Sequence, residues 1–243
     1  MTDYRDSHSA EGYGLGYEDA YDPDTFYGQL WREVEMPLLR ETMIGLREKG
    51  ATSCLDFACG TGRILQVAAE EFDETVGVDV SEAMLSRARI NAPNSQLLQQ
   101  DLTNTPLDRQ FDVVTAFRFF RNAQPQLREE AIAALAKHLR PGGHLVVNTH
   151  GNPNAPAIMA LKLKAKTSNI QANSLSHSAL ASLLESSGLS VVSTTHYSYL
   201  PRIGNAFPSW YGKLMIPAEK LTQIPVLREV AESSLIVARL NAD

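Results

Sequence analysis

The sequence has few cysteines, no long apolar run and no excess of positive charge. Its two cysteines, Cys54 and Cys59, lie in or beside an expected core strand, so both are interpreted as reduced packing residues rather than a disulfide framework. No apolar run approaches the length of a membrane-spanning helix, and residues 1–6 lack the basic and apolar parts of a signal peptide. We therefore expect a cytoplasmic protein that does not associate with membranes.

Charge and ligand chemistry argue against two further classes of protein. The formal net charge of −6 disfavours a nucleic-acid binder, because such proteins need a basic surface that neutralises phosphates. No cluster of cysteine, histidine and carboxylate residues has the spacing of metal ligands, so we predict no metal. The 243 residues suffice for one large domain with a buried core.

The chain is organised around residues 55–63, Leu-Asp-Phe-Ala-Cys-Gly-Thr-Gly-Arg. An apolar run that ends in an acid, followed by small residues and a helical pattern, predicts a strand, a tight turn and a helix. Gly60 and Gly62 lack a Cβ, so a ligand can lie against this turn and the helix N-terminus. A dinucleotide fingerprint needs a small residue where Leu65 stands, so a nucleoside without phosphates fits better than a pyrophosphate.

A second apolar run, Val76-Gly77-Val78, ends in Asp79 about twenty residues after the turn. In a βαβ unit such an acid lies at the carboxyl end of the second strand, where it can accept hydrogen bonds from both ribose hydroxyls. The pattern therefore predicts a ribose-containing ligand.

Three later motifs extend this pattern: Gln100-Asp101-Leu102, the strand pattern of residues 111–117, and Leu139-Arg140-Pro141-Gly142-Gly143. Together with the turn and Asp79, their order and spacing resemble the class I S-adenosylmethionine-dependent methyltransferases of small-molecule type, strongly over residues 50–150. The family's usual first glycine is replaced by Ala58. The resemblance implies a Rossmann-like, doubly wound α/β fold with a seven-stranded sheet of order 3-2-1-4-5-7-6, its last strand antiparallel, and an N-terminal helical lid.

The resemblance also implies S-adenosylmethionine as the cofactor and a set of residues that bind it. Asp101 would accept from the adenine amine and Leu102 would cover the ring, although Asp101 alternatively only caps a loop. The expected cofactor-binding residues are Asp56, Ala58, Gly60, Gly62, Arg63, Asp79, Val80, Met84, Asp101, Leu102, Phe117 and Tyr21.

The domain organisation follows from the same comparison. We expect residues 1–48 to form the lid and residues 49–243 the methyltransferase domain, with an insertion at about 152–175 and a long connection at about 201–232. Apolar residues recur at helical spacing over Phe26–Leu46, and Pro37 is predicted to break this run into two helices. Alternatively, the aromatic residues of this segment pack on the edge of the sheet. The other expected helices are 64–71, 82–91, 127–139, 157–166 and 176–187, and the other expected strands are 75–79, 96–100, 111–117, 144–149, 190–200 and 235–240.

The exits of two strands supply candidate catalytic residues. Arg118 and Arg121 follow the fourth strand, and His150 follows the fifth. Ligands bind outside the carboxyl ends of strands in open α/β sheets, so these residues are expected to face the acceptor, with His150 as a base whose ordinary pKa suits neutrality. The alternative is that Arg121 pairs with an N-terminal acid and His150 with a backbone carbonyl.

Transfer of a methyl group to an oxygen or nitrogen of a small metabolite, such as a sugar or a natural-product intermediate, is the function that these expectations support. A nucleotide-dependent oxidoreductase is an alternative that Leu65 disfavours, and a catalytically inactive cofactor-binding protein is another. The expected partner is a small-molecule acceptor, and the sequence leaves open a homodimer.

Overall fold

The structure is a computed structural model that describes residues 19, 21–156, 158–159, 175–200, 214, 217–219 and 224–241. The expected helix at 157–166 and most of the 152–175 insertion and the 201–232 connection lie outside these residues. The elements are α2 (Phe26–Leu30), η2 (Trp31–Glu35), α3 (Met36–Arg47), β1 (Ser53–Phe57), α4 (Arg63–Glu71), β2 (Glu74–Asp79), α5 (Glu82–Asn91), β3 (Gln96–Gln99), β4 (Phe111–Ala116), α6 (Pro125–Lys137), β5 (Leu139–Thr149), α8 (His177–Ser186), β6 (Leu189–Tyr197), α10 (Pro225–Arg228) and β7 (Ser233–Leu240).

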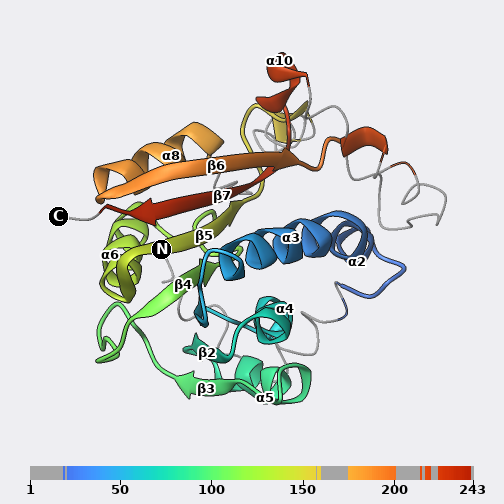
Figure 1. Cartoon of the computed structure of the whole chain (residues 1–243). Coiled ribbons are helices and arrows are strands. Elements are labelled where there is room, and N and C mark those ends of the chain that lie inside the picture. Colours follow the sequence, from blue (N-terminus) through green and yellow to red (C-terminus); the bar gives the residue numbers. More distant parts are fainter. Residues whose placement is uncertain are drawn as a thin grey trace.

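The strands form one seven-stranded sheet of order β3-β2-β1-β4-β5-β7-β6 (Figure 1). Strands β1 to β5 pair in parallel, and β7 runs antiparallel to both β5 and β6. β1 is buried along its whole length, as expected for a strand that helices cover on both faces. The sheet order and the antiparallel last strand expected from the sequence are confirmed.

Two apolar clusters form the core. One joins α2, α3 and α4 to the sheet and includes the fully buried Leu39 and Met43, so α3 is an integral part of the folded core. The other contains Ile132 of α6 and Leu180 of α8, together with Leu145 of β5. The helices thus separate into two layers, which gives the doubly wound arrangement.

The break at Pro37 takes a different form from the expected pair of separate helices. The chain continues from α2 into α3 through the π-helical turn η2, and Pro37 lies in the first turn of α3. The amide of Met36 donates to the carbonyl of Trp31, five residues earlier. Proline has no amide hydrogen to donate, and a wider turn just before it accommodates this loss without ending the helix.

Several element bounds also differ from expectation. α6 ends at Lys137, and β5 already begins at Leu139, so the segment Pro141-Gly142-Gly143 lies within an irregular start of β5 rather than stopping a helix. The pairing register of β4 and β5 shifts between Phe111 and Val113 at this point. β6 ends at Tyr197 because Ser198 takes a left-handed conformation with φ 64°. No helix within the described ranges is both long and apolar enough to cross a membrane.

Candidate functional site

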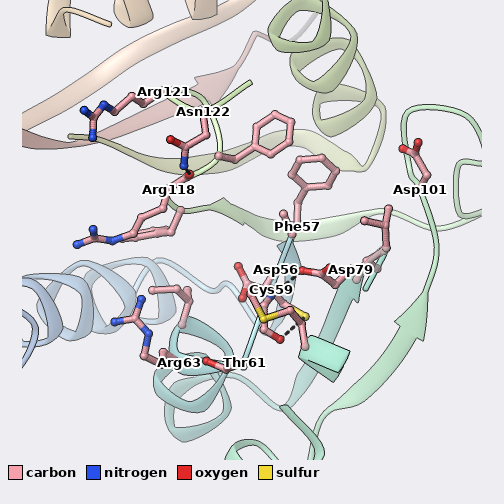
Figure 2. A pocket seen from close by; sticks show the side chains of 18 of the residues that line it. Asp56, Phe57, Cys59, Thr61, Arg63, Asp79, Asp101, Arg118, Arg121 and Asn122 are labelled. Atoms are coloured by element: carbon pink, nitrogen blue, oxygen red, sulfur yellow. Dashed lines mark hydrogen bonds between the residues drawn. The ribbon is translucent and has the colours of Figure 1, made fainter. Parts of the chain in front are cut away.

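A cavity of about 300 Å³ opens at the carboxyl ends of the parallel strands. Its walls come from the turn after β1, from the ends of β2 and β4, from His150 after β5, and from Tyr21 and Tyr27 ahead of and within α2. Figure 2 shows labelled side chains from the turn after β1, from the end of β2 and from the exit of β4 around one space. A cavity at this edge of a doubly wound sheet, of this volume, is typical of a small-molecule site.

The glycine turn shapes the floor of the cavity. Gly62 has φ 83°, and a Cβ there would lie 3.1 Å from Ala88 of α5, so glycine lets the two helices approach. Ala58, which replaces the first glycine of the family pattern, has φ 53°, in a region that a small side chain tolerates at some cost. Gly62 itself is absent from the cavity wall, whereas Ala58 and Gly60 line it.

Asp79 is held at the cavity by backbone donors. The amide of Gly60 donates to Oδ2 (2.8 Å), and the amide of Ser81 donates to Oδ1 (2.9 Å). Ser81 is in turn the N-cap of α5 and accepts a hydrogen bond from the amide of Met84. The carboxylate is therefore fixed between the glycine turn and the next helix, and a carboxylate has lone pairs for further donors.

Asp56, near the end of β1, is buried with 1% of its surface exposed, yet it lines the cavity. The hydroxyl of Thr115 donates to its Oδ1 (2.6 Å), and its Oδ2 has no hydrogen-bond partner among the described residues. Burial raises the pKa of Asp56 to about 7, and the nearby charge of Asp79 adds to this effect. A buried acceptor without a partner fits a ligand that brings a donor, such as an ammonium group.

Asp101 makes the loop-capping contacts that the sequence left open as an alternative, and its contact with adenine stays a prediction. It lines the cavity, and it also caps its loop, because its Oδ1 accepts from the amide and hydroxyl of Thr103 and its Oδ2 accepts from Asn104 Nδ2 (2.7 Å). Leu102 instead turns into the apolar core with 1% of its surface exposed and is not part of the cavity wall. The apolar surfaces beside Asp79 and Asp101 are those of Val80 and Met84.

Three arginines, Arg63, Arg118 and Arg121, gather at the other end of the cavity (Figure 2). The guanidinium carbon of Arg63 lies 3.2 Å from the ring centre of Tyr21 and 4.9 Å from that of Trp31. These contacts connect the N-terminal segment to the helix that follows the glycine turn.

Arg118 leaves β4 in a left-handed conformation with φ 57° and is held by a buried network. Its Nη2 lies 3.0 Å from Glu35 Oε1 and 3.1 Å from Oε2, and its amide donates to Asn148 Oδ1 (2.7 Å). The hydroxyl of Tyr197 also donates to Glu35 Oε1 (3.0 Å). Arg118 thus pairs with an acid of the N-terminal region.

His150 has a lower pKa than the base that the sequence predicted. Burial and the charges of Arg118 and Arg121 hold the pKa of His150 well below its ordinary value of 6.5. Its Nδ1 is buried and has no hydrogen-bond partner among the described residues, so the alternative of a bond to a backbone carbonyl has no support at this atom. The imidazole is therefore neutral at physiological pH but a weaker base than its ordinary pKa suggested.

All of the candidate residues from the sequence line this one cavity except Gly62 and Leu102. The buried carboxylate of Glu35 was not predicted, because no motif marks it; the signal for it is an acid within an otherwise apolar helical stripe. The roles of Asn122 and Thr103 in the cavity wall were also not predicted. Among the described residues, no group of three or more His, Cys, Asp or Glu side chains is arranged to hold a metal ion.

Comparison with known proteins agrees with this geometry. Residues 54–143 match the family model of a methyltransferase domain. The chain carries a methyltransferase domain over these residues. This domain is similar to a dTDP-3-amino-3,4,6-trideoxy-alpha-D-glucopyranose N,N-dimethyltransferase of Streptomyces venezuelae, with 39% identity over 108 residues that cover 43% of this chain and 45% of the relative. A dTDP-3-amino-3,6-dideoxy-alpha-D-glucopyranose N,N-dimethyltransferase of Streptomyces fradiae is 35% identical over 99 residues, which cover 40% and 39% of the two chains.

The fold of the chain is similar to that of a solved methyltransferase structure. The magnesium protoporphyrin IX methyltransferase (ChlM) of Synechocystis PCC 6803 with bound SAH superimposes with a TM-score of 0.68, 16% identity and 98% coverage of both chains. This likeness shows the fold alone. The matches to the two sugar N,N-dimethyltransferases cover less than half of their length. The family resemblance stated from the sequence is confirmed for the domain.

Proposed function

We propose that this protein transfers a methyl group from S-adenosylmethionine to an oxygen or nitrogen of a small metabolite, such as a sugar or a natural-product intermediate. The observation that carries the proposal is the pair of carboxylates at the glycine turn. Asp79 is fixed by two backbone amides beside Asp56, whose buried Oδ2 lacks a partner among the described residues. One carboxylate suits the ribose hydroxyls and the other suits the ammonium group of the cofactor.

The remaining cofactor residues are assigned by position. Asp101 would accept from the adenine amine, with Val80 and Met84 against the ring, and Arg63 would face the cofactor's carboxylate from the start of α4. Leu102 is better explained as a core residue that supports the loop of Asp101. Tyr21 would close the cavity over Arg63. This contact supports an N-terminal lid, but one limited to the segment ahead of α3, because α3 is part of the core.

When bound, S-adenosylmethionine supplies an electrophilic methyl group that a lone pair of the acceptor attacks. The chain's own contribution is to align the acceptor and exclude water, which supplies much of the acceleration for such a displacement. Arg118 and Arg121 lie on the side of the cavity away from Asp101 (Figure 2), and together with His150 they would orient the acceptor. The neutral His150 would accept a hydrogen bond from the attacking hydroxyl or amine.

The similarity to N,N-dimethyltransferases of dTDP-amino sugars supports a nitrogen acceptor on a sugar.

The oxidoreductase alternative loses support from the packing of Leu65. Leu65 is fully buried, and a Cβ on Gly77 would lie 2.7 Å from its side chain. The Leu65 side chain therefore packs tightly against β2 below the turn.

A direct test uses S-adenosylmethionine with an isotopically labelled methyl group and a panel of dTDP-amino sugars, free amino sugars and hydroxylated metabolites. Appearance of the label in an acceptor, detected by mass spectrometry, is the expected result. Tight binding of S-adenosylhomocysteine without transfer to any acceptor would favour the cofactor-binding protein. Saturable micromolar binding of NADH would favour the oxidoreductase.

A further inference from the structure

The segment 100–110 joins β3 to β4 and brings Asp101 to the wall of the cavity (Figure 2). Its first turn is closed locally, because the carbonyl of Asp101 accepts a hydrogen bond from the amide of Thr105 (2.8 Å). Two leucines pack the segment against the apolar core, Leu102 with 1% of its surface exposed and Leu107 partly buried. The position of Asp101 therefore depends on how the rest of the segment is held.

The imidazole of His138, which follows α6 and has 1% of its surface exposed, contacts this segment. Its Nε2 lies 2.9 Å from the amide nitrogen of Leu107, and its Nδ1 lies 2.7 Å from the carbonyl oxygen of Ala134. An amide can only donate and a carbonyl can only accept, so Nε2 is the acceptor and Nδ1 carries the hydrogen. The two partners thus fix one neutral tautomer.

The two hydrogen bonds of the imidazole have different roles. The bond to Ala134 satisfies a carbonyl in the last turn of α6, which is a common way to end a helix. The bond to Leu107 instead crosses to the segment that carries Asp101. The backbone carbonyl of His138 also accepts from the amide of Phe111 (2.8 Å), at the start of β4. This residue therefore holds the segment at Leu107 and the start of the following strand.

We infer that His138 is a positioning residue of the cofactor site, which holds the loop that presents Asp101 to the adenine side of the cavity. The restraint passes from the amide of Leu107 through Pro106, whose ring fixes its φ angle, to Thr105, which is bonded to the carbonyl of Asp101. This inference deepens the proposed function and rests on it for the role of Asp101.

Two substitutions of His138 separate the loop contact from the helix cap. Glutamine can place its side-chain oxygen near the position of Nε2, so His138→Gln keeps an acceptor for Leu107 and loses the donor to Ala134. Asparagine is shorter and places its amide nitrogen near the position of Nδ1, so His138→Asn keeps the cap and loses the contact with Leu107. A role in helix capping alone therefore predicts the opposite order of effects.

The position of Asp101 is read from two ligands, S-adenosylhomocysteine and S-inosylhomocysteine, whose base carries an oxygen in place of the adenine amine. Calorimetry gives the affinity for each, and the wild type should prefer S-adenosylhomocysteine because Asp101 is proposed to accept from that amine. We expect His138→Asn to bind S-adenosylhomocysteine roughly tenfold more weakly, with a smaller preference between the ligands, and His138→Gln to stay within about twofold of the wild type.

A control variant accounts for lost stability. Leu184 is fully buried on α8, which packs on β6 at the opposite edge of the sheet from β3. Leu184→Ala lowers stability by opening a cavity far from the Asp101 loop. It should therefore keep both affinities and the preference for S-adenosylhomocysteine.

Amide hydrogen exchange, followed by NMR, tests the contact without a ligand. The amide of Leu107 should exchange roughly tenfold faster in His138→Asn than in the wild type, because it loses its acceptor. The amide of Phe111 should keep its rate, since it donates to the backbone carbonyl of the same residue. The ¹⁵N shifts of the His138 ring in the wild type give the tautomer and require no variant.

Three results would overturn the inference: a hydrogen on Nε2 of His138 in the wild type, equal exchange of the Leu107 amide in all three proteins, or loss of affinity in His138→Gln rather than in His138→Asn. A different result would contradict the proposed role of Asp101 instead. In that case the wild type binds the two ligands equally, while the Leu107 amide still depends on the side chain of His138.

Discussion

Glu35 and Arg118, 83 residues apart in the chain, form a buried ion pair in which one guanidinium nitrogen lies 3.0 and 3.1 Å from the two carboxylate oxygens. The pair joins the π-helical turn η2 to the exit of β4, at the wall of the cavity. Removing one partner of a buried pair leaves the other charge without compensation, which is far more costly than removing a pair at the surface.

Replacing Arg118 by methionine should therefore destabilise the fold by about 3 kcal/mol, because Glu35 would stay buried and, among the described residues, would keep only the Tyr197 hydroxyl as a donor. Arg40→Met is the matched control, since Arg40 pairs with Glu70 at the surface, and it should cost less than about 1 kcal/mol. Denaturant unfolding measures both. Equal losses in the two variants would contradict the assignment of a buried pair, and Glu35→Gln combined with Arg118→Met should recover part of the loss.

The sequence predicted the parts of this fold that depend on local pattern. The strand with Asp56, the glycine turn and Asp79 lie where expected because apolar runs, small residues and terminal acids specify a strand, a turn and a helix within a short stretch. The helix after Ser81 was likewise marked by its cap, and the hydroxyl of Ser81 accepts the expected hydrogen bond from Met84.

Other features depend on residues that only the fold brings together. Nothing near Glu35 in the sequence indicates Arg118 or Tyr197 as its partners. The lowered pKa of His150 likewise arises from burial and from two arginines in the segment after β4, so the ordinary pKa of histidine was a wrong guide to its basicity. Pro37 was interpreted as a helix break, whereas a π-helical turn that ends two residues earlier accommodates it. Such effects have no short-range signature.

The pH dependence of cofactor binding should report on Asp56. In the ligand-free protein burial raises its pKa to about 7, so the carboxyl is protonated below that pH and cannot attract an ammonium group. We expect affinity for S-adenosylhomocysteine to fall about tenfold from pH 8 to pH 6, because binding must first remove the proton. The Asp56→Asn variant should bind more weakly at pH 8 and show a flat profile. An equally steep profile in this variant would assign the dependence to another group.

Folding stability gives an independent measure of the same pKa. Because the native carboxyl holds its proton more tightly than the unfolded chain, whose value is near 3.8, its ionisation costs stability as the pH rises from about 4 to about 7. The free energy of unfolding of Asp56→Asn should therefore increase relative to the wild type across this range and stay constant above it. Parallel curves for the two proteins would show that the pKa is not raised.

Tyr21 should contribute to cofactor binding through its ring. The guanidinium of Arg63 lies over that ring, and both side chains line the cavity. Tyr21→Ala should weaken binding of S-adenosylhomocysteine by about 1 kcal/mol, whereas Tyr21→Phe, which keeps the aromatic face, should bind nearly as the wild type does. Calorimetry on the three proteins distinguishes these outcomes. Unchanged affinity in Tyr21→Ala would mean that the N-terminal segment does not close over the cofactor.

His150 should affect turnover rather than cofactor affinity. Its neutral imidazole lines the cavity, where the charges of Arg118 and Arg121 act on it. Once an acceptor is known, His150→Gln should lower kcat by roughly 10²-fold if the imidazole takes the acceptor's proton, with the affinity for S-adenosylhomocysteine retained. Unaltered turnover between about pH 6 and pH 9 would instead indicate that positioning alone carries the catalysis.

The most direct test of the account is calorimetric titration of S-adenosylhomocysteine into the wild-type protein, Asp79→Ala and the control Glu82→Gln, whose side chain is exposed on α5. If Asp79 holds the ribose, its removal should weaken binding by about 2 kcal/mol, or roughly 30-fold, while the control binds as the wild type does. The same affinity in Asp79→Ala and in the wild type would contradict the assignment of this cavity as the cofactor site.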